Sequence, residues 1–269
     1  MSYNSKYDTD TIKTFDNEVL SVAFKNQLTT RMDMNQFITM NYELAEEPGM
    51  VKKIRTYSGT GNVEDLAMGA KNSVIIGSEW VESEYEVKVT QGTVKHYDEQ
   101  QMADPNAIDK AIEHLSEKMI NDNTAKIVAE LDKGSHKVLN FDYSFDMIAE
   151  AISMLPEESN DGLYLMIARK DIAKFQKKLR DSLQYVEAFV RTGYIGHICG
   201  VPVYANDAVP TGKAYLATRE AVTCFMKRGA SVETARDIEA RANTIVGNIV
   251  RVIALTNDDK VIVLSAAAA

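Results

Sequence analysis

The sequence has few of the residues that cross-link small secreted proteins or build catalytic centres. It contains two cysteines, Cys199 and Cys224, and four histidines among 269 residues. Two cysteines are too few for a disulfide framework, so we expect both to be small core residues. No apolar run approaches the length of a membrane span, and the opening MSYNSKYDTDTIK lacks the basic and apolar regions of a secretory signal. We therefore expect a soluble protein with no membrane partner.

Motifs of catalysis and nucleotide binding are also missing. H-E-x-x-H, G-x-S-x-G and C-x-x-C do not occur. Gly69 is not followed by the Lys-Ser/Thr pair of a phosphate loop, and Gly193, Gly196 and Gly200 have the wrong spacing for a dinucleotide fingerprint. The sequence therefore predicts no catalytic residues, no cofactor and no metal ligands.

Positive charge is scarce relative to negative charge. The chain has 39 acidic and 30 basic residues, a formal net charge of −9. A surface that grips phosphate backbones over a wide area is therefore disfavoured. The charge thus disfavours nucleic-acid binders but does not distinguish among other acidic proteins.

The last third of the chain holds most of the pattern. It reads GYIGHICGVPVYANDAVPTGKAYLATREAVTCFMKRGASVETARDIEARANTIVGNIVRVIALTNDDKVIVL. Its three glycines at 193–200 predict an irregular loop, and Val-Pro-Thr-Gly predicts a turn. Alternating or branched runs predict strands at 201–205, 214–217, 221–226 and 231–236. We expect 244–255 and 260–264 to form a closing antiparallel hairpin whose Ile and Val residues pack on a long helix.

That long helix is predicted between Asp104-Pro105 and Gly134. Asp104 is a suitable N-cap, and Pro105 suits the first helical position. The apolar stripe of the helix consists of Ile108, Ala111, Ile112, Leu115, Met119, Ile120, Ile127, Val128 and Leu131. At 1.5 Å per residue the helix would be about 40 Å long.

Two further units flank this helix in the sequence. Alternation at 51–57 and 85–89 predicts two strands of an excursion too long for a tight hairpin turn, which implies packing on another body. Residues 141–226 are predicted to form an α/β unit with a buried strand at 163–168 and a basic helix at 171–180. We interpret the basic residues of that helix as a solvated face or a subunit contact rather than as an anion site.

Several segments in this order resemble the major capsid proteins of tailed bacteriophages. They are GYIGHICGVPVY, VP-x-G-x-AYLA, EAVTCFMKR, VETARD followed by R-x-N, and a closing strand pair that ends in KVIVL. The resemblance implies an α+β Hong Kong 97-type fold. The implied parts are an N-terminal arm at 1–50, an extended β-hairpin loop at 51–91, a peripheral domain with a spine helix on an antiparallel sheet at 92–140, an axial α/β domain at 141–226, peripheral return strands at 227–264 and a loose tail at 265–269.

The same resemblance implies a function and its partners. The chain would assemble as pentamers and hexamers into an icosahedral shell around double-stranded DNA, in the virion, after assembly in the bacterial cytoplasm. A portal protein is implied, and a separate scaffolding protein is expected because the arm begins almost at Met1. Two alternatives stay open: an encapsulin-like compartment shell, and a monomeric acidic α/β enzyme.

Subunit contacts are expected where the resembling family places them. Phe24 and Leu28 lie on an amphipathic stretch of the arm, which could instead pack on its own domain. Trp80 lies in the extended loop among acidic residues, where it could anchor a neighbour or pack locally. The remaining candidates are Gly61 and Gly69 in the same loop, and Lys174 and Lys178 on the basic helix.

Overall fold

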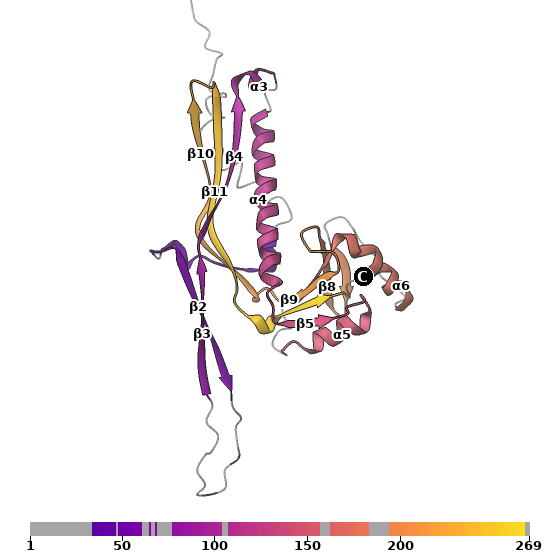
Figure 1. Ribbon diagram of the computed structural model, residues 1–269. Coiled ribbons are helices and arrows are strands. Elements are labelled where there is room, and N and C mark those ends of the chain that lie inside the picture. Colours follow the sequence, from indigo (N-terminus) through magenta and orange to yellow (C-terminus); the bar gives the residue numbers. More distant parts are fainter. Residues whose placement is uncertain are drawn as a thin grey trace, which may run out of the picture.

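The structure is a computed structural model that describes residues 34–46, 48–60, 65, 68, 77–103, 107–156, 162–182 and 194–266. These residues form two packed bodies and a projecting ribbon, each with its own β-sheet (Figure 1). One body is a long sheet with one long helix, and the other is a six-stranded sheet with shorter helices. This mixture confirms the predicted α+β class.

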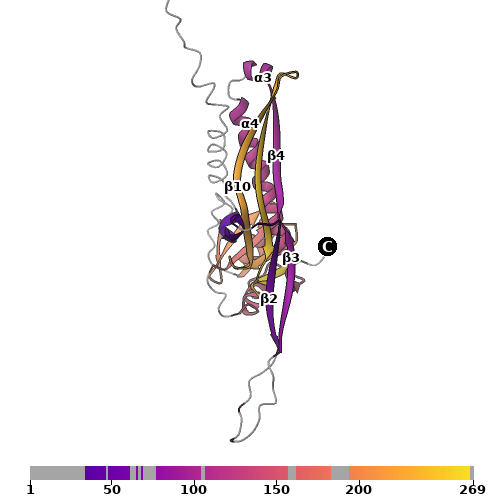
Figure 2. The same ribbon diagram turned by 90° about the vertical axis from the view of Figure 1, so that its left-hand side faces the viewer.

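The elongated body is built on a four-stranded sheet. Helix α4, Ala107–Leu131, lies lengthwise along it (Figures 1 and 2). β10 and β11 form a hairpin, β4 pairs antiparallel with β11, and the short β1 runs parallel to the start of β10. In spatial order the strands are β1 (Thr39–Asn41), β10 (Val222–Asp237), β11 (Ala242–Leu255) and β4 (Lys88–Tyr97).

Helix α4 buries the apolar stripe that its sequence predicts. Residues three and four positions apart share one face of a helix, and here that face lies on the sheet. The buried members are Ile108, Ile112, Leu115, Met119, Ile120, Ile127, Val128 and Leu131. The predicted spine helix on an antiparallel sheet is confirmed, whereas the proposed caps Asp104 and Pro105 lie outside the described residues.

The second body is a six-stranded sheet with helices α5 (Phe145–Ser153) and α6 (Ile172–Ser182) beside it (Figure 1). All five residues of β6 are buried, as their continuous apolar run predicts. In spatial order the strands are β5 (His136–Leu139), β12 (Val261–Ser265), β9 (Lys213–Ala217), β6 (Tyr164–Ala168), β8 (Val201–Asn206) and β7 (Tyr194–Ile198).

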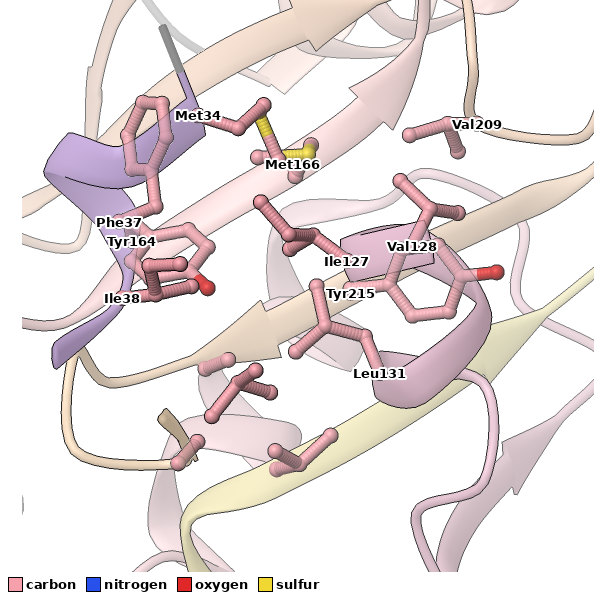
Figure 3. Packing of buried hydrophobic residues seen from close by; sticks show 14 of the residues in the cluster. Met34, Phe37, Ile38, Ile127, Val128, Leu131, Tyr164, Met166, Val209 and Tyr215 are labelled. Atoms are coloured by element: carbon pink, nitrogen blue, oxygen red, sulfur yellow. The ribbon is translucent and has the colours of Figure 1, made fainter. Parts of the chain in front are cut away.

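One hydrophobic cluster joins both bodies to the segment that precedes the ribbon. The short 3-10 helix η1, Met34–Phe37, packs its apolar side chains between the end of α4 and the six-stranded sheet (Figure 3). The Phe37 ring lies 4.9 Å from that of Tyr164 and 4.7 Å from that of Tyr204, centroid to centroid. Met34, Phe37 and Ile38 of the predicted arm therefore belong to the subunit's own core.

A polar contact reinforces this junction. Asp132, just after α4, accepts hydrogen bonds from Lys213 Nζ at 2.7 Å and Tyr215 Oη at 3.1 Å, both on β9. Burial alone would raise the pKa of Asp132, but the bonds from Lys213 and Tyr215 hold that pKa below its usual value. The end of α4 is thus tied to the second body by charge as well as by apolar packing.

The predicted closing hairpin is wrong. β11 pairs with β10 and β4, whereas β12 crosses to the other sheet and pairs with β9 and β5. Thr256 and Asn257 donate backbone hydrogen bonds to the Ala221 carbonyl, which turns the chain away from β11. β12 is buried from Val261 to Leu264, as an inner strand requires.

The expected packing of the β11 side chains needs a related correction. Ile245, Ile249 and Ile253 contact the α4 clusters, as expected. Val250 and Val252 instead pack with the cluster on the opposite face, because side chains alternate between the two faces of a strand.

Several predicted boundaries also shift. The expected glycine loop at 193–200 contains strand β7, which accommodates Gly196 at a register irregularity. The boundary at 226/227 falls inside β10, and β5 and β12 belong to the six-stranded sheet rather than to the long one.

Two expectations about individual residues are corrected. Cys224 is buried as expected, but Cys199 is exposed in the turn between β7 and β8. The start of the expected loose tail is ordered, because Ser265 ends β12 and Ala266 donates its N–H to the Gly212 carbonyl at 2.7 Å.

Candidate assembly surfaces

The two-stranded ribbon projects from the rest of the molecule, and most of its described side chains are exposed (Figure 1). β2, Val51–Thr60, pairs antiparallel with β3, Gly77–Glu86, over ten residues of each strand. The ribbon projects away from the long sheet and past the second body (Figures 1 and 2). It ends five residues before the predicted boundary at Gln91, which lies within β4.

Among the ribbon side chains that the structure describes, those at the base pack on the body. Val87 donates its N–H to the Met50 carbonyl at 2.7 Å, and the Tyr85 hydroxyl bonds to the Leu255 carbonyl at 3.4 Å. Ile54 and Tyr85 are half-buried against an apolar cluster around Phe225. These contacts fix where the ribbon leaves the body.

Exposed charges cross the ribbon farther along. Lys53 pairs with Glu82 at 3.0 Å and with Glu84 at 2.5 Å, and Arg55 pairs with Glu82 at 3.2 Å. Such exposed pairs contribute little to stability, because solvent screens their charges. Val81, next to Glu82 on β3, is 55% exposed. A ribbon held by such contacts is only marginally stable by itself, so its outer part needs cover.

The predicted contact residues of the arm and loop are only partly described. Trp80 lies in β3, in register with Tyr57 of β2. Phe24, Leu28, Gly61 and Gly69 lie outside the described residues.

The two predicted lysines on α6 make ion pairs within the subunit. Lys178 pairs with Asp142 at 3.2 Å, and Lys174 pairs with the buried Asp171 at 3.0 Å. Asp171 also accepts hydrogen bonds from the Tyr143 hydroxyl at 2.9 Å and from the Gly212 N–H at 2.6 Å. Burial would raise the pKa of Asp171, but Gly212, Lys174 and Tyr143 hold that pKa below its usual value.

A second candidate surface was missed by the sequence interpretation. β4 is an edge strand, and within the described residues no strand pairs with its outer side. Its exposed side chains include Val89 and Tyr97. The period-two pattern of KVTQGTVKHY could have identified this strand, but its first residues were assigned to the ribbon.

Neither a metal-ligand cluster nor a membrane-spanning helix occurs in the described part of the chain. It holds no cluster of three or more His, Cys, Asp or Glu side chains that could bind a metal ion. The described helices include none that is both long and apolar enough to cross a bilayer.

Comparison with known proteins reveals a likeness in structure but not in sequence. No family model matches the chain, and no curated protein matches its sequence. The capsid of a native GTA particle has a TM-score of 0.70 at 8% identity, covering 88% of this chain and 90% of that one. A structure of Mycobacterium phage Che8 has a TM-score of 0.63 at 17% identity, covering 86% and 90%.

An encapsulin is similar to the same degree. The holo-SrpI encapsulin complex from Synechococcus elongatus PCC 7942 has a TM-score of 0.64 at 15% identity, covering 86% of this chain and 85% of that one. The structural neighbours are mostly phage capsid proteins with the Hong Kong 97-type fold. The chain therefore has the Hong Kong 97-type fold.

Proposed function

We propose that this chain is the major capsid protein of a tailed phage and self-assembles into an icosahedral head shell. The observation that carries the proposal is the ribbon, which projects away from the two packed bodies of a chain with the Hong Kong 97-type fold (Figure 1). A protein that acts alone gains nothing from a long uncovered ribbon, whereas a shell subunit can lay the ribbon on a neighbour.

Association then performs the function. Each subunit contributes several contacts, and a closed symmetric lattice sums modest contacts into a stable particle. Pentamers and hexamers would close the shell, with the second body around their axes. Trp80, Phe24, Leu28, Gly61, Gly69, Lys174 and Lys178 are the proposed contact residues.

The proposed contents and partners follow from the same function. The shell would enclose double-stranded DNA, and a net charge of −9 would keep its inner wall from binding that DNA tightly. A portal protein and a separate scaffolding protein would take part in assembly in the bacterial cytoplasm, and the product would be the virion head.

Electron microscopy of the purified protein tests this function. We expect closed, uniform shells with pentameric and hexameric units, either from the chain alone or with its scaffolding protein. A protein that remains monomeric or forms a small oligomer under all such conditions would contradict the proposal and favour the acidic enzyme.

A shell that encloses protein is the second candidate, because the encapsulin complex resembles the chain as closely as the phage structure does. The contents of nuclease-treated particles from the producing cells separate the two. Protected double-stranded DNA supports the phage capsid. A protein cargo without DNA supports the encapsulin-like compartment.

A further inference from the structure

A pocket of about 330 Å³ lies where the ribbon meets the elongated body. Glu84, Tyr85 and Glu86 line it from the ribbon. The rest of the lining comes from the long sheet and from α4, and it includes Lys88, Lys126, Glu130 and Arg251. The pocket is therefore bounded by two parts of the fold, the ribbon and the elongated body.

Arg251 is the unusual group in this pocket. Its alternation with Ile249 and Ile253 turns its side chain toward α4, between two apolar clusters. The residue is 7% exposed, and its Nε has no hydrogen-bond partner. Among the described residues, no carboxylate forms an ion pair with it. A buried charge without a partner is costly, so its retention calls for a compensating group.

The carboxylates around the pocket already have cationic partners. Glu84 lies 2.5 Å from Lys53 Nζ, Glu86 lies 3.9 Å from Lys88 Nζ, and Glu130 lies 2.5 Å from Lys133 Nζ. The remaining lysine of the lining, Lys126, pairs with Asp122 at 2.6 Å. Within the described part of the chain, the positive charge of Arg251 is thus left over after these pairs are formed.

A second unpartnered atom indicates what kind of group completes the pocket. Glu130 Oε1 accepts a hydrogen bond from Lys133, but its buried Oε2 has no hydrogen-bond partner. The pocket therefore offers a cationic donor, at Arg251, together with an acceptor. An acidic stretch of polypeptide matches both, because its carboxylate accepts from a guanidinium and its backbone N–H groups donate.

We propose that this pocket receives an acidic side chain from a second copy of the chain when copies assemble. The inference rests on the proposed self-assembly. The composition of the chain supports this occupant. Every copy has 39 acidic residues against 30 basic ones, so each neighbouring copy can offer an acidic side chain to the pocket. Arg251 is then uncompensated in the free subunit and paired in the shell.

Arg251→Met tests the proposal, because methionine is apolar and carries no charge. Replacing an unpaired buried charge by an apolar side chain is neutral or stabilising, so the variant subunit should melt at or above the wild-type temperature. The concentration needed for shell formation should rise at least about tenfold, since losing one partner of a buried charge pair is costly at an interface. Melting is followed below the assembly concentration, and shells are counted by negative-stain microscopy.

Arg228→Met is the matched control. Arg228 lies opposite Val250, on the face of the sheet away from α4, and forms an exposed pair with Glu233 at 3.7 Å. The Arg228→Met substitution removes the same charge from the same sheet but outside the pocket. Assembly of this variant should therefore stay near the wild-type level. An equal loss of shells in both variants would reduce the effect to net charge and overturn the proposal.

Other outcomes would also overturn it. Wild-type assembly of Arg251→Met would show that the pocket is not at an interface. A clearly lower melting temperature of the variant would show a partner within the subunit, such as Glu84 or Glu86 after a ribbon movement. A third test compares melting temperatures in sodium phosphate and in sodium chloride at equal ionic strength. If phosphate stabilises the wild-type subunit but not the variant, and the variant still forms shells, the site binds a free anion. If the wild-type chain never forms shells, the proposed function itself fails.

Discussion

Buried polar residues in this protein differ in whether they find hydrogen-bond and ion-pair partners within their own subunit. Asp171 is fully buried and accepts hydrogen bonds from a hydroxyl and a backbone N–H, in addition to its ion pair with Lys174. Arg251 is nearly as buried and has no such set of partners. Replacement of the first should weaken the fold, and replacement of the second should weaken assembly.

Asp171→Asn tests the first statement and its pH dependence. The folded-state pKa of Asp171 is below its unfolded value, so its charge stabilises the fold above the unfolded pKa of about 3.9, and this stability is lost as pH falls through the folded pKa. We expect the variant to lose about 2 kcal/mol of unfolding free energy at pH 7. Its melting temperature should also fall less steeply than that of the wild type below about pH 4. Parallel melting curves against pH for the two proteins would contradict this role.

Ile253→Asp tests the position of β11. Ile253 is 8% exposed in the cluster that also contains the end of α4. An unpaired buried carboxylate costs several kcal/mol, comparable with the stability of a whole domain, so soluble subunit should be lost. Ile238→Asp is the control, because Ile238 is 80% exposed and its variant should be soluble. Normal yield and melting of Ile253→Asp would show that the assigned face of β11 is wrong.

At the scale of whole elements, the sequence predicted the helices and strands whose apolar pattern lies within the element itself. Helix α4 and strand β6 have an apolar stripe or a continuous apolar run, and both were placed correctly. The partner of β12 was not predictable in this way, because Val-Ile-Val-Leu suits an edge or an inner strand equally well. Bonds from Thr256 and Asn257 to Ala221 decide its direction, and they join residues that are 35 or more positions apart.

The contact between β4 and α4 depends on one glycine. A Cβ on Gly92 would lie 2.3 Å from Leu115 Cδ1, so Gly92→Ala must displace Leu115 or the helix. We expect a loss of about 1 to 3 kcal/mol. The double variant Gly92→Ala, Leu115→Ala should lose less than the sum of the single variants, because the smaller side chain removes the clash. Denaturant unfolding measures all three.

Gly229→Ala is the control for this contact, since nothing lies within 4 Å of a Cβ built there. It should leave the unfolding free energy nearly unchanged. Additive losses in the double variant would show that Gly92 does not act through Leu115.

At the scale of the whole molecule, we expect the ribbon to contribute to assembly and the core to contribute to folding. The subunit core runs from η1 through the end of α4 into the six-stranded sheet, and the ribbon lies outside it (Figures 1 and 3). The sequence predicted that an excursion at 51–91 needs another body to pack on. It could not show which residues a neighbour covers, because that information lies in a contact between chains.

The central claim concerns residues 51–86, which are the ribbon and the segment that joins its two strands. We propose that this excursion builds shells and contributes little to the fold of its own subunit. Replacing Gly61–Gly77 by a short Gly-Ser turn should therefore leave a soluble subunit with wild-type circular dichroism and melting. A loss of about 2 kcal/mol per interface would weaken each association step about thirtyfold, and that loss repeats at every subunit.

Sedimentation velocity of the wild-type and ribbon-shortened proteins, side by side at equal concentration, tests this most directly. Under conditions in which the wild type assembles, with its scaffolding protein where that is required, the account predicts large closed particles for the wild type. It predicts only folded subunits or small oligomers for the shortened chain. Intact particles from the shortened chain would contradict the claim that the ribbon holds the shell together. An unfolded, insoluble product would place the segment in the subunit's own core.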